Sequence, residues 1–137
     1  MEPSFHLCII DDDEIYRFVT IQSVKFLGME HKSSVFSNGE DALSFISENL
    51  DKPAVLPDII LLDIDMPIMD GFQFLEGYRP VAPQIVKPID IYMVSSSVDP
   101  EDIKRAKAYP TVVNYISKPL NSDVLKGIIE KALLNQN

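Results

Sequence analysis

The sequence predicts an α/β fold: a doubly wound sheet of five parallel strands, with five helices covering both faces to make three layers. Short apolar runs alternate along the chain with stretches in which apolar residues recur at helical spacing. Strands that alternate with helices favour a parallel sheet, because each helix returns the chain to the edge where the next strand starts. The length of 137 residues and the hydrophobic content of 46% suit one domain. We therefore expect a single domain over residues 1–137, with a core of about residues 5–134 and no output domain.

The five expected strands are short runs that end in polar or turn-forming residues. They cover residues 5–10, 31–36, 58–62, 89–94 and 112–116. The third run is apolar from Ile59 to Leu62, which is typical of a strand buried on both faces of a sheet. The second is the weakest of the five. Asp63 follows the third strand, and sites in open α/β sheets form at this carboxyl end.

The five expected helices are marked by apolar spacing and by residues that start or stop a helix. They cover residues 14–27 and 42–50, a segment from about 71, a segment from 100 and a segment after 121. Gly28 is a natural stop for the first helix, and Pro110 closes the short fourth one. Asp99 and Asn121 are placed to act as N-caps. Residues 79–88 contain three prolines and are expected to be irregular.

The charge and the composition narrow the classes of partner. The net charge of −9 argues against nucleic acid as a direct partner, because phosphate backbones attract basic surfaces. No apolar run approaches the roughly 20 residues that span a bilayer, and the first residues lack the basic start of a signal peptide. The lone Cys8 lies in an apolar run and is expected to be a buried thiol. We therefore expect a cytoplasmic protein with no membrane partner.

The candidate site residues follow four of the five expected strands. Asp11 and Asp12 follow the first, Asp63 the third, Ser95 the fourth and Lys118 the fifth. Parallel strands end at one edge of the sheet, so these groups are expected to lie together. Two carboxylates about 4 Å apart repel by roughly 4 kcal/mol at an effective dielectric constant of 20, so a cation or protons must relieve the cluster. A helix N-terminus would account for the first acids but not for Asp63, and an all-oxygen ligand set favours Mg²⁺.

These residues lie in four motifs that resemble the receiver domain of two-component response regulators, in the correct order. The motifs are IIDDD at 9–13, LLDIDMPIMDG at 61–71, MVSSS at 93–97 and YISKPL at 115–120. The resemblance covers about residues 5–134 and is closest in kind to single-domain, chemotaxis-regulator-like receivers. It implies the flavodoxin-like receiver fold and a phosphorylation-activated signalling switch rather than an enzyme acting on an external substrate.

The resemblance also implies a role for each acid. Asp63 would accept a phosphoryl group from a sensor histidine kinase or a histidine phosphotransfer protein. Asp12, Asp63 and the backbone carbonyl of Asp65 would bind Mg²⁺ or Mn²⁺ directly, and Asp11 would bind it through water. No other cofactor is implied.

The remaining motif residues would respond to the phosphoryl group. By resemblance, Lys118 would pair with one phosphoryl oxygen, while the Ser95 hydroxyl and the Ser96 backbone N–H would donate to others. Ser95 and Tyr115 would form the switch, and a cis bond before Pro119 would aim Lys118 inward. The downstream protein would bind the fourth helix, fifth strand and fifth helix. The resemblance fits either a monomer or a phosphorylation-dependent dimer.

Three other readings are open on the sequence. Asp63 and Asp65 mimic the Asp-x-Asp motif of Mg²⁺-dependent haloacid-dehalogenase-like phosphatases, but that motif normally ends the first strand, and 137 residues leave no room for a cap domain. A flavodoxin-like cofactor binder would need a phosphate-binding loop after the first strand, where this sequence has acids. A pseudo-receiver that works without phosphorylation is disfavoured because every site residue is present.

Overall fold

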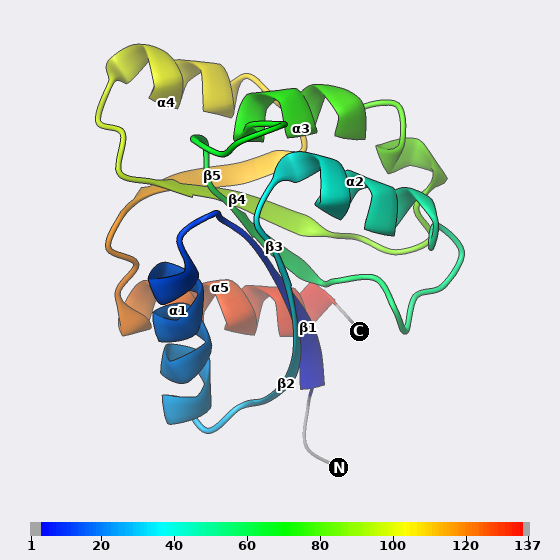
Figure 1. The fold of residues 1–137 in the computed structure, drawn as a ribbon. Helices are drawn as coiled ribbons and strands as arrows, with labels where there is room; N and C mark the ends of the chain where they lie inside the picture. The colour runs from blue at the N-terminus through cyan, green and yellow to red at the C-terminus, as the bar shows by residue number, and fades with distance from the viewer. Residues whose placement is uncertain (1–3, 136–137) are drawn as a thin grey trace.

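A five-stranded parallel sheet forms the centre of the computed structural model, which describes residues 4–135 (Figure 1). The strands are β1 (Ser4–Ile10), β2 (Glu30–Phe36), β3 (Ile59–Leu62), β4 (Asp90–Ser95) and β5 (Val112–Ser117). Their order across the sheet is β2-β1-β3-β4-β5, and all four neighbouring pairs are parallel. This confirms the predicted fold class. It also places β3, the strand before Asp63, in the middle of the sheet.

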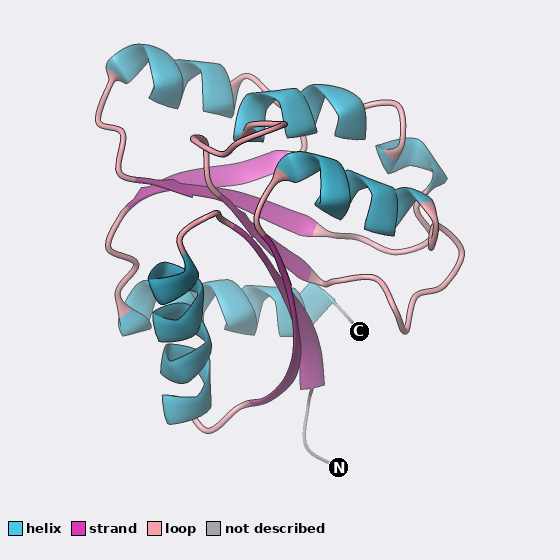
Figure 2. Ribbon diagram, in the orientation of Figure 1, coloured by secondary structure: helices cyan, strands magenta, loops and turns pink. Residues whose placement is uncertain are grey.

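Five α-helices cover the two faces of this sheet. They are α1 (Glu14–Phe26), α2 (Gly39–Ser47), α3 (Gly71–Tyr78), α4 (Pro100–Lys107) and α5 (Ser122–Asn135). Figure 2 shows α2, α3 and α4 on one side of the sheet and α1 and α5 on the other. The predicted caps are confirmed, since Asp99 accepts from the N–H of Glu101 and Asn121 accepts from that of Val124. None of the helices between residues 4 and 135 is long and apolar enough to cross a membrane.

Each face of the sheet carries its own hydrophobic core, and β3 contributes to both. Ile60 and Leu62 pack into the cluster under α2, α3 and α4, whereas Ile59 and Leu61 pack into the cluster under α1 and α5. All four side chains are at most 2% exposed. Side chains alternate between the faces of a strand, so a continuous apolar run is what a strand with two covered faces requires. Because β3 lies between the two cores, packing on both faces of the sheet fixes the position of Asp63 at the end of the strand.

Helix α1 departs from the simple expectation that a helical apolar pattern faces the core. Ile15, Phe18, Val19 and Phe26 are 76%, 62%, 52% and 89% exposed. Val24 is the fully buried apolar residue of this helix. The helix therefore has a second apolar stripe, which faces away from the sheet.

The connection between α3 and β4 is irregular, as its prolines predict, apart from a short 3-10 helix at Ala82–Gln84. Lys87 near its end donates to Asp58 at 3.1 Å, and the other carboxylate oxygen of Asp58 accepts the N–H of His6 at 2.8 Å. Asp58 therefore ties the connection to the starting ends of β1 and β3. This contact lies at the opposite end of β3 from Asp63.

Candidate functional site

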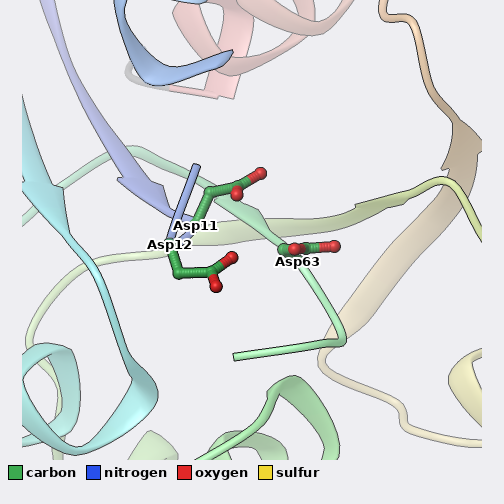
Figure 3. Close-up of side chains that lie close together, drawn as sticks. All are labelled: Asp11, Asp12 and Asp63. Carbon is green, nitrogen blue, oxygen red and sulfur yellow. The ribbon is translucent and has the colours of Figure 1, made fainter. Parts of the chain in front are cut away.

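Three carboxylates converge where β1 and β3 end. Asp63 follows β3, and its backbone N–H donates to the carbonyl of Ile10 at 2.9 Å, which brings it beside the end of β1. Asp11 and Asp12 follow β1 directly. Each of the three acids has a carboxylate oxygen within 4.8 Å of an oxygen of the others (Figure 3). Asp11 and Asp63 are buried and Asp12 is exposed, so the cluster opens to solvent on one side.

The environment of Asp63 opposes its ionisation. Burial and the charge of Asp11 raise the pKa of Asp63 from 3.8 to about 6, although the charge of Lys118 acts in the other direction. Burial alone penalises any charged carboxylate, and the neighbouring negative charge adds to that penalty. The carboxylate is still mostly ionised at neutral pH. It is a high-energy anion that an approaching cation would stabilise.

Lys118 supplies positive charge at the same point. Its Nζ donates to Asp11 Oδ2 at 2.8 Å and lies 3.7 Å from Asp63 Oδ2. Its backbone N–H donates to the carbonyl of Ser95 at 2.9 Å, which draws the loop after β5 toward the end of β4. The Lys118–Pro119 bond is cis, as the sequence resemblance implies. Burial would lower the pKa of Lys118, but its bond to Asp11 and the charge of Asp63 outweigh that effect and raise it.

The donor set fits a hard divalent cation. The clustered ligands are all carboxylate oxygens, which Mg²⁺ and Mn²⁺ prefer, and the exposed side offers room for water ligands. Asp65 lies two residues beyond Asp63, and its own side chain is exposed. Its backbone carbonyl remains the expected further ligand.

The turn after Asp63 is shaped by local backbone chemistry. Asp70 accepts from the N–H of Gln73 at 2.8 Å, and the Gln73 side chain accepts from the N–H of Asp70 at 2.9 Å, so the two residues form a capping box for α3. A Cβ at Gly71 would overlap the carbonyl oxygen of Asp63. Ile68 has a φ of 68°, which is the left-handed region that β-branched residues rarely adopt. This turn therefore fixes the Asp63 backbone closely.

The serines at the end of β4 are linked through Ser97 to Tyr115, the residue predicted as the second part of the switch. Ser95 is 1% exposed, and its Oγ accepts the N–H of Ser97 at 3.1 Å. The hydroxyl of Tyr115 donates to the carbonyl of Ser97 at 2.7 Å. The hydroxyl of Ser97 donates to Asp102 of α4 at 2.7 Å, and Ser96 is exposed beside it. Ser97 thus joins Ser95, Tyr115 and α4, a link that sequence reasoning missed.

Two further residues of α1 contact the site and were not singled out from the sequence. The ring centroid of Tyr16 lies 4.2 Å from Lys118 Nζ, and an Nη of Arg17 donates to the carbonyl of Asp11 at 2.6 Å. Both lie in the first turn of α1, directly after the acids. Their proximity in sequence to Asp11 and Asp12 indicates that they lie near the site. Nothing in the sequence indicates that Tyr16 contacts a lysine 102 residues away.

Comparisons with known proteins point to one family. Residues 7–130 match the response regulator receiver domain family. Among similar proteins, the probable methanogenesis regulatory protein FilR2 of Methanothrix harundinacea is 24% identical over 95% of this chain and 82% of its own length. The sensor histidine kinase CheAY of Helicobacter pylori is 30% identical over 96% of this chain. This chain spans only 15% of CheAY and 34% of a protein-glutamate methylesterase/protein-glutamine glutaminase of Trichodesmium erythraeum that it also resembles.

Solved structures show the same fold over nearly the whole chain. A two-component response regulator from Cytophaga hutchinsonii has a TM-score of 0.81 and 26% identity, covering 98% of this chain and 99% of that one. A CheY-like receiver domain protein from Methanospirillum hungatei has a TM-score of 0.75 and 25% identity, covering 96% of both chains. The family match extends over most of the sequence, and the fold of residues 4–135 agrees with it. The chain belongs to the response regulator receiver domain family.

Proposed function

We propose that Asp63 accepts a phosphoryl group from a sensor histidine kinase or a histidine phosphotransfer protein, and that the phosphorylated form binds a downstream protein. Receiver domains are switches of signalling proteins, so the chain's own chemistry serves regulation. The observation that carries the proposal is the meeting of Asp11, Asp12, Asp63 and Lys118 at one edge of the sheet. It brings a candidate nucleophile, a candidate cation site and a positive charge together in one place.

In the proposed reaction, a carboxylate oxygen of Asp63 attacks the phosphorus of a phosphohistidine. The new O–P bond forms as the P–N bond to the imidazole breaks, and the imidazole leaves. Asp11, Asp12, Asp63 and the Asp65 backbone carbonyl would hold Mg²⁺ or Mn²⁺, which supplies positive charge next to the phosphoryl oxygens when bound. Phosphoryl transfer depends mainly on positioning and charge stabilisation, which a cluster of fixed charges provides.

The residues around Asp63 would then bind the transferred group. Lys118 would exchange its bond to Asp11 for one to a phosphoryl oxygen, because a doubly charged group attracts the ammonium more strongly than one carboxylate does. The Ser95 hydroxyl and the Ser96 backbone N–H would donate to the other oxygens. This is supported by the position of Ser95 and Ser96 at the end of β4, next to the site.

The switch would run through Ser97. Turning the Ser95 hydroxyl toward a phosphoryl oxygen removes its bond to the Ser97 N–H, and Tyr115 and Asp102 are held by the same residue. The output surface would be α4, β5 and α5, which Ser97 and Tyr115 adjoin. We propose a cytoplasmic protein that contacts neither nucleic acid nor membrane and that is a monomer or a phosphorylation-dependent dimer.

The exposed apolar stripe of α1 is the surface that we assign to the phosphodonor protein. The stripe begins at Ile15, which lines a cavity of about 210 Å³ together with Asp13 and Pro119, next to the site. A protein whose phosphohistidine reaches Asp63 would then lie close to the start of α1. Phe18→Glu should slow phosphorylation by a protein donor and leave phosphorylation by acetyl phosphate unchanged; equal slowing with both donors, or with neither, would contradict this assignment.

Intact-mass measurement tests the proposed acceptor. With Mg²⁺ and acetyl phosphate, the wild type should gain one phosphoryl mass, and Asp63→Asn should not. Asp70→Asn is the matched control, because it removes a carboxylate from the α3 cap, outside the cluster. An adduct that forms as well on Asp63→Asn, or that needs no divalent cation, refutes the assignment.

A second experiment tests the role of Lys118. Lys118→Ala should retain cation binding, because the carboxylates stay in place, but should no longer change its partner binding after phosphodonor treatment. Unchanged signalling by this variant would rule out the role. The phosphatase reading predicts multiple turnover on phosphomonoesters instead, and no observation of the fold or of the comparisons favours it.

A further inference from the structure

Among residues 4–135, the Lys118 ammonium makes one side-chain hydrogen bond, although the lysine side chain is mostly buried. Of its three N–H groups, one donates to Asp11 Oδ2 at 2.8 Å. Asp63 Oδ2, at 3.7 Å, is close enough for an ion pair but too far for a hydrogen bond. The side chain is nevertheless only 18% exposed, so water does not surround the charge. Another group must therefore contact the rest of the ammonium.

That group is the ring of Tyr16. Its centroid lies 4.2 Å from Lys118 Nζ, within the distance at which an aromatic face attracts a cation. The attraction is stronger when the cation is shielded from water, as this one is. Among residues 4–135, Tyr16 is the one aromatic residue whose ring faces the Lys118 ammonium.

The backbone of Tyr16 is fixed at both of its polar groups. Its N–H donates to the Asp13 side chain at 3.1 Å, and its carbonyl accepts from the Thr20 hydroxyl at 2.9 Å. Its ring packs against the core cluster beneath α1 and α5. A ring held in this way can restrict the lysine side chain, whose four-carbon chain is flexible.

The phenol hydroxyl takes no part in this arrangement. It is buried and has no hydrogen-bond partner within the described part of the chain. A buried hydroxyl without a partner costs free energy, so its removal is tolerated or favourable. The useful part of Tyr16 at this site is the aromatic face, and a phenylalanine would supply the same face.

We propose that Tyr16 is a positioning residue for Lys118: its ring holds the ammonium between Asp11 and Asp63, where a phosphoryl oxygen on Asp63 would meet it. The proposal rests on the proposed role of Lys118 in binding that oxygen. Without the ring, the lysine side chain gains freedom to turn toward solvent. The cation site is unaffected, because Tyr16 makes none of the hydrogen bonds of Asp11, Asp12 or Asp63.

The test compares Tyr16→Phe, which keeps the ring, with Tyr16→Leu, which keeps only apolar bulk. With acetyl phosphate at saturating Mg²⁺, Tyr16→Phe should phosphorylate within about twofold of the wild-type rate. Tyr16→Leu should be slower by about tenfold, equivalent to about 1.4 kcal/mol in the activation free energy. The Mg²⁺ dissociation constant, measured by calorimetry, should be unchanged in both. If thermal melting shows that Tyr16→Leu does not fold, Tyr16→Met replaces it as the ringless variant.

Two readouts separate positioning from a general packing effect. The pKa of the Lys118 ammonium, followed by NMR of its labelled side chain, should move in Tyr16→Leu and stay in place in Tyr16→Phe. In a Lys118→Ala background, Tyr16→Leu should cause no further loss of rate, because the two residues act as one unit.

The proposal is overturned if Tyr16→Leu matches the wild type, if Tyr16→Phe is as slow as Tyr16→Leu, or if the losses from Tyr16 and Lys118 add independently. Failure of the proposed function has a different signature. In that case the wild type gains no phosphoryl group or Asp63→Asn gains one as readily, whatever residue is at position 16. The Lys118 NMR signal reports on the ring even then.

Discussion

Replacing Asp63 by asparagine should stabilise the protein against unfolding at neutral pH. The folded structure raises the pKa of Asp63 from 3.8 to about 6, first through burial and then through the charge of Asp11. The folded state therefore binds this proton more tightly than the unfolded state does. The contribution of Asp63 to the free energy of unfolding therefore falls as pH rises from 3.8 through about 6, and the fall is complete above that range.

The size of the loss follows from the shift. One pKa unit corresponds to about 1.4 kcal/mol, so a rise from 3.8 to about 6 corresponds to at most about 3 kcal/mol. The asparagine side chain of Asp63→Asn would resemble the protonated acid, since it is neutral and of similar shape. Asp63→Asn would also lose the attraction between the Asp63 carboxylate and the Lys118 ammonium, which lie 3.7 Å apart. The pKa shift of Asp63 already includes this attraction. We expect a gain of about 1–3 kcal/mol in the free energy of unfolding at neutral pH.

Urea unfolding of the wild type and Asp63→Asn, in the presence of a chelator, measures this gain. The difference between the two proteins should be largest at neutral pH and should shrink as pH approaches the ordinary pKa of an aspartate. Burial and Lys87 lower the pKa of His6, so stability also falls in acid as that group becomes protonated in the unfolded chain. His6 is present in both proteins, and its contribution cancels in the difference.

Mg²⁺ provides the second half of the assay. A cation that binds only the folded state stabilises it by mass action, so Mg²⁺ should raise the stability of the wild type more than that of Asp63→Asn. The reasoning is refuted if Asp63→Asn is equally stable or less stable at neutral pH, or if the difference between the proteins does not depend on pH.

Three other substitutions test the structure at the two ends of β3: two change the turn after Asp63, and one changes the ion pair at the opposite end of the strand. Gly71→Ala should destabilise the protein by about 1–3 kcal/mol and slow phosphorylation, because the new methyl group displaces the Asp63 carbonyl. The control Gly127→Ala, in open space on α5, should instead stabilise the protein slightly. Equal effects of the two substitutions in urea unfolding would contradict the packing argument. Ile68→Asn should stabilise by about 1 kcal/mol, since asparagine tolerates the left-handed backbone at φ 68° and Ile68 is 74% exposed; an equal gain in Ile68→Val would show that strain is not the cause. Lys87→Ala should destabilise by about 1–3 kcal/mol, because Asp58 loses a partner while it stays mostly buried; an unchanged urea midpoint would show that the pair contributes nothing.

The strands, the caps and the position of the acids could be predicted because each depends on residues close together in sequence. The apolar run before Asp63 and the cap residues Asp99 and Asn121 are local signals, and the structure confirms them. The meeting of Asp63 with Asp11 then follows from topology, since parallel strands end at one edge.

Other features could not be predicted because they depend on side-chain packing between distant segments. The contact between Tyr16 and Lys118 needs the loop after β5 to lie over the first turn of α1. The pairing of Lys87 with Asp58 joins residues 29 apart through an irregular connection. Helical spacing also shows that α1 has apolar stripes but not which stripe faces the sheet, so the exposure of Phe18 was not predictable.

The bonds of Ser97 have a consequence for how the protein responds to partial phosphorylation. Its N–H, carbonyl and hydroxyl contact Ser95, Tyr115 and Asp102 in turn. A short stretch of backbone turns as a unit, so an arrangement that frees one of these groups disturbs the other two as well. In the proposed switch, phosphorylation would then change how many molecules occupy each arrangement, rather than how far each molecule moves. NMR spectra of a half-phosphorylated sample should therefore contain two sets of resonances for the loop after β4, in proportion to the two forms.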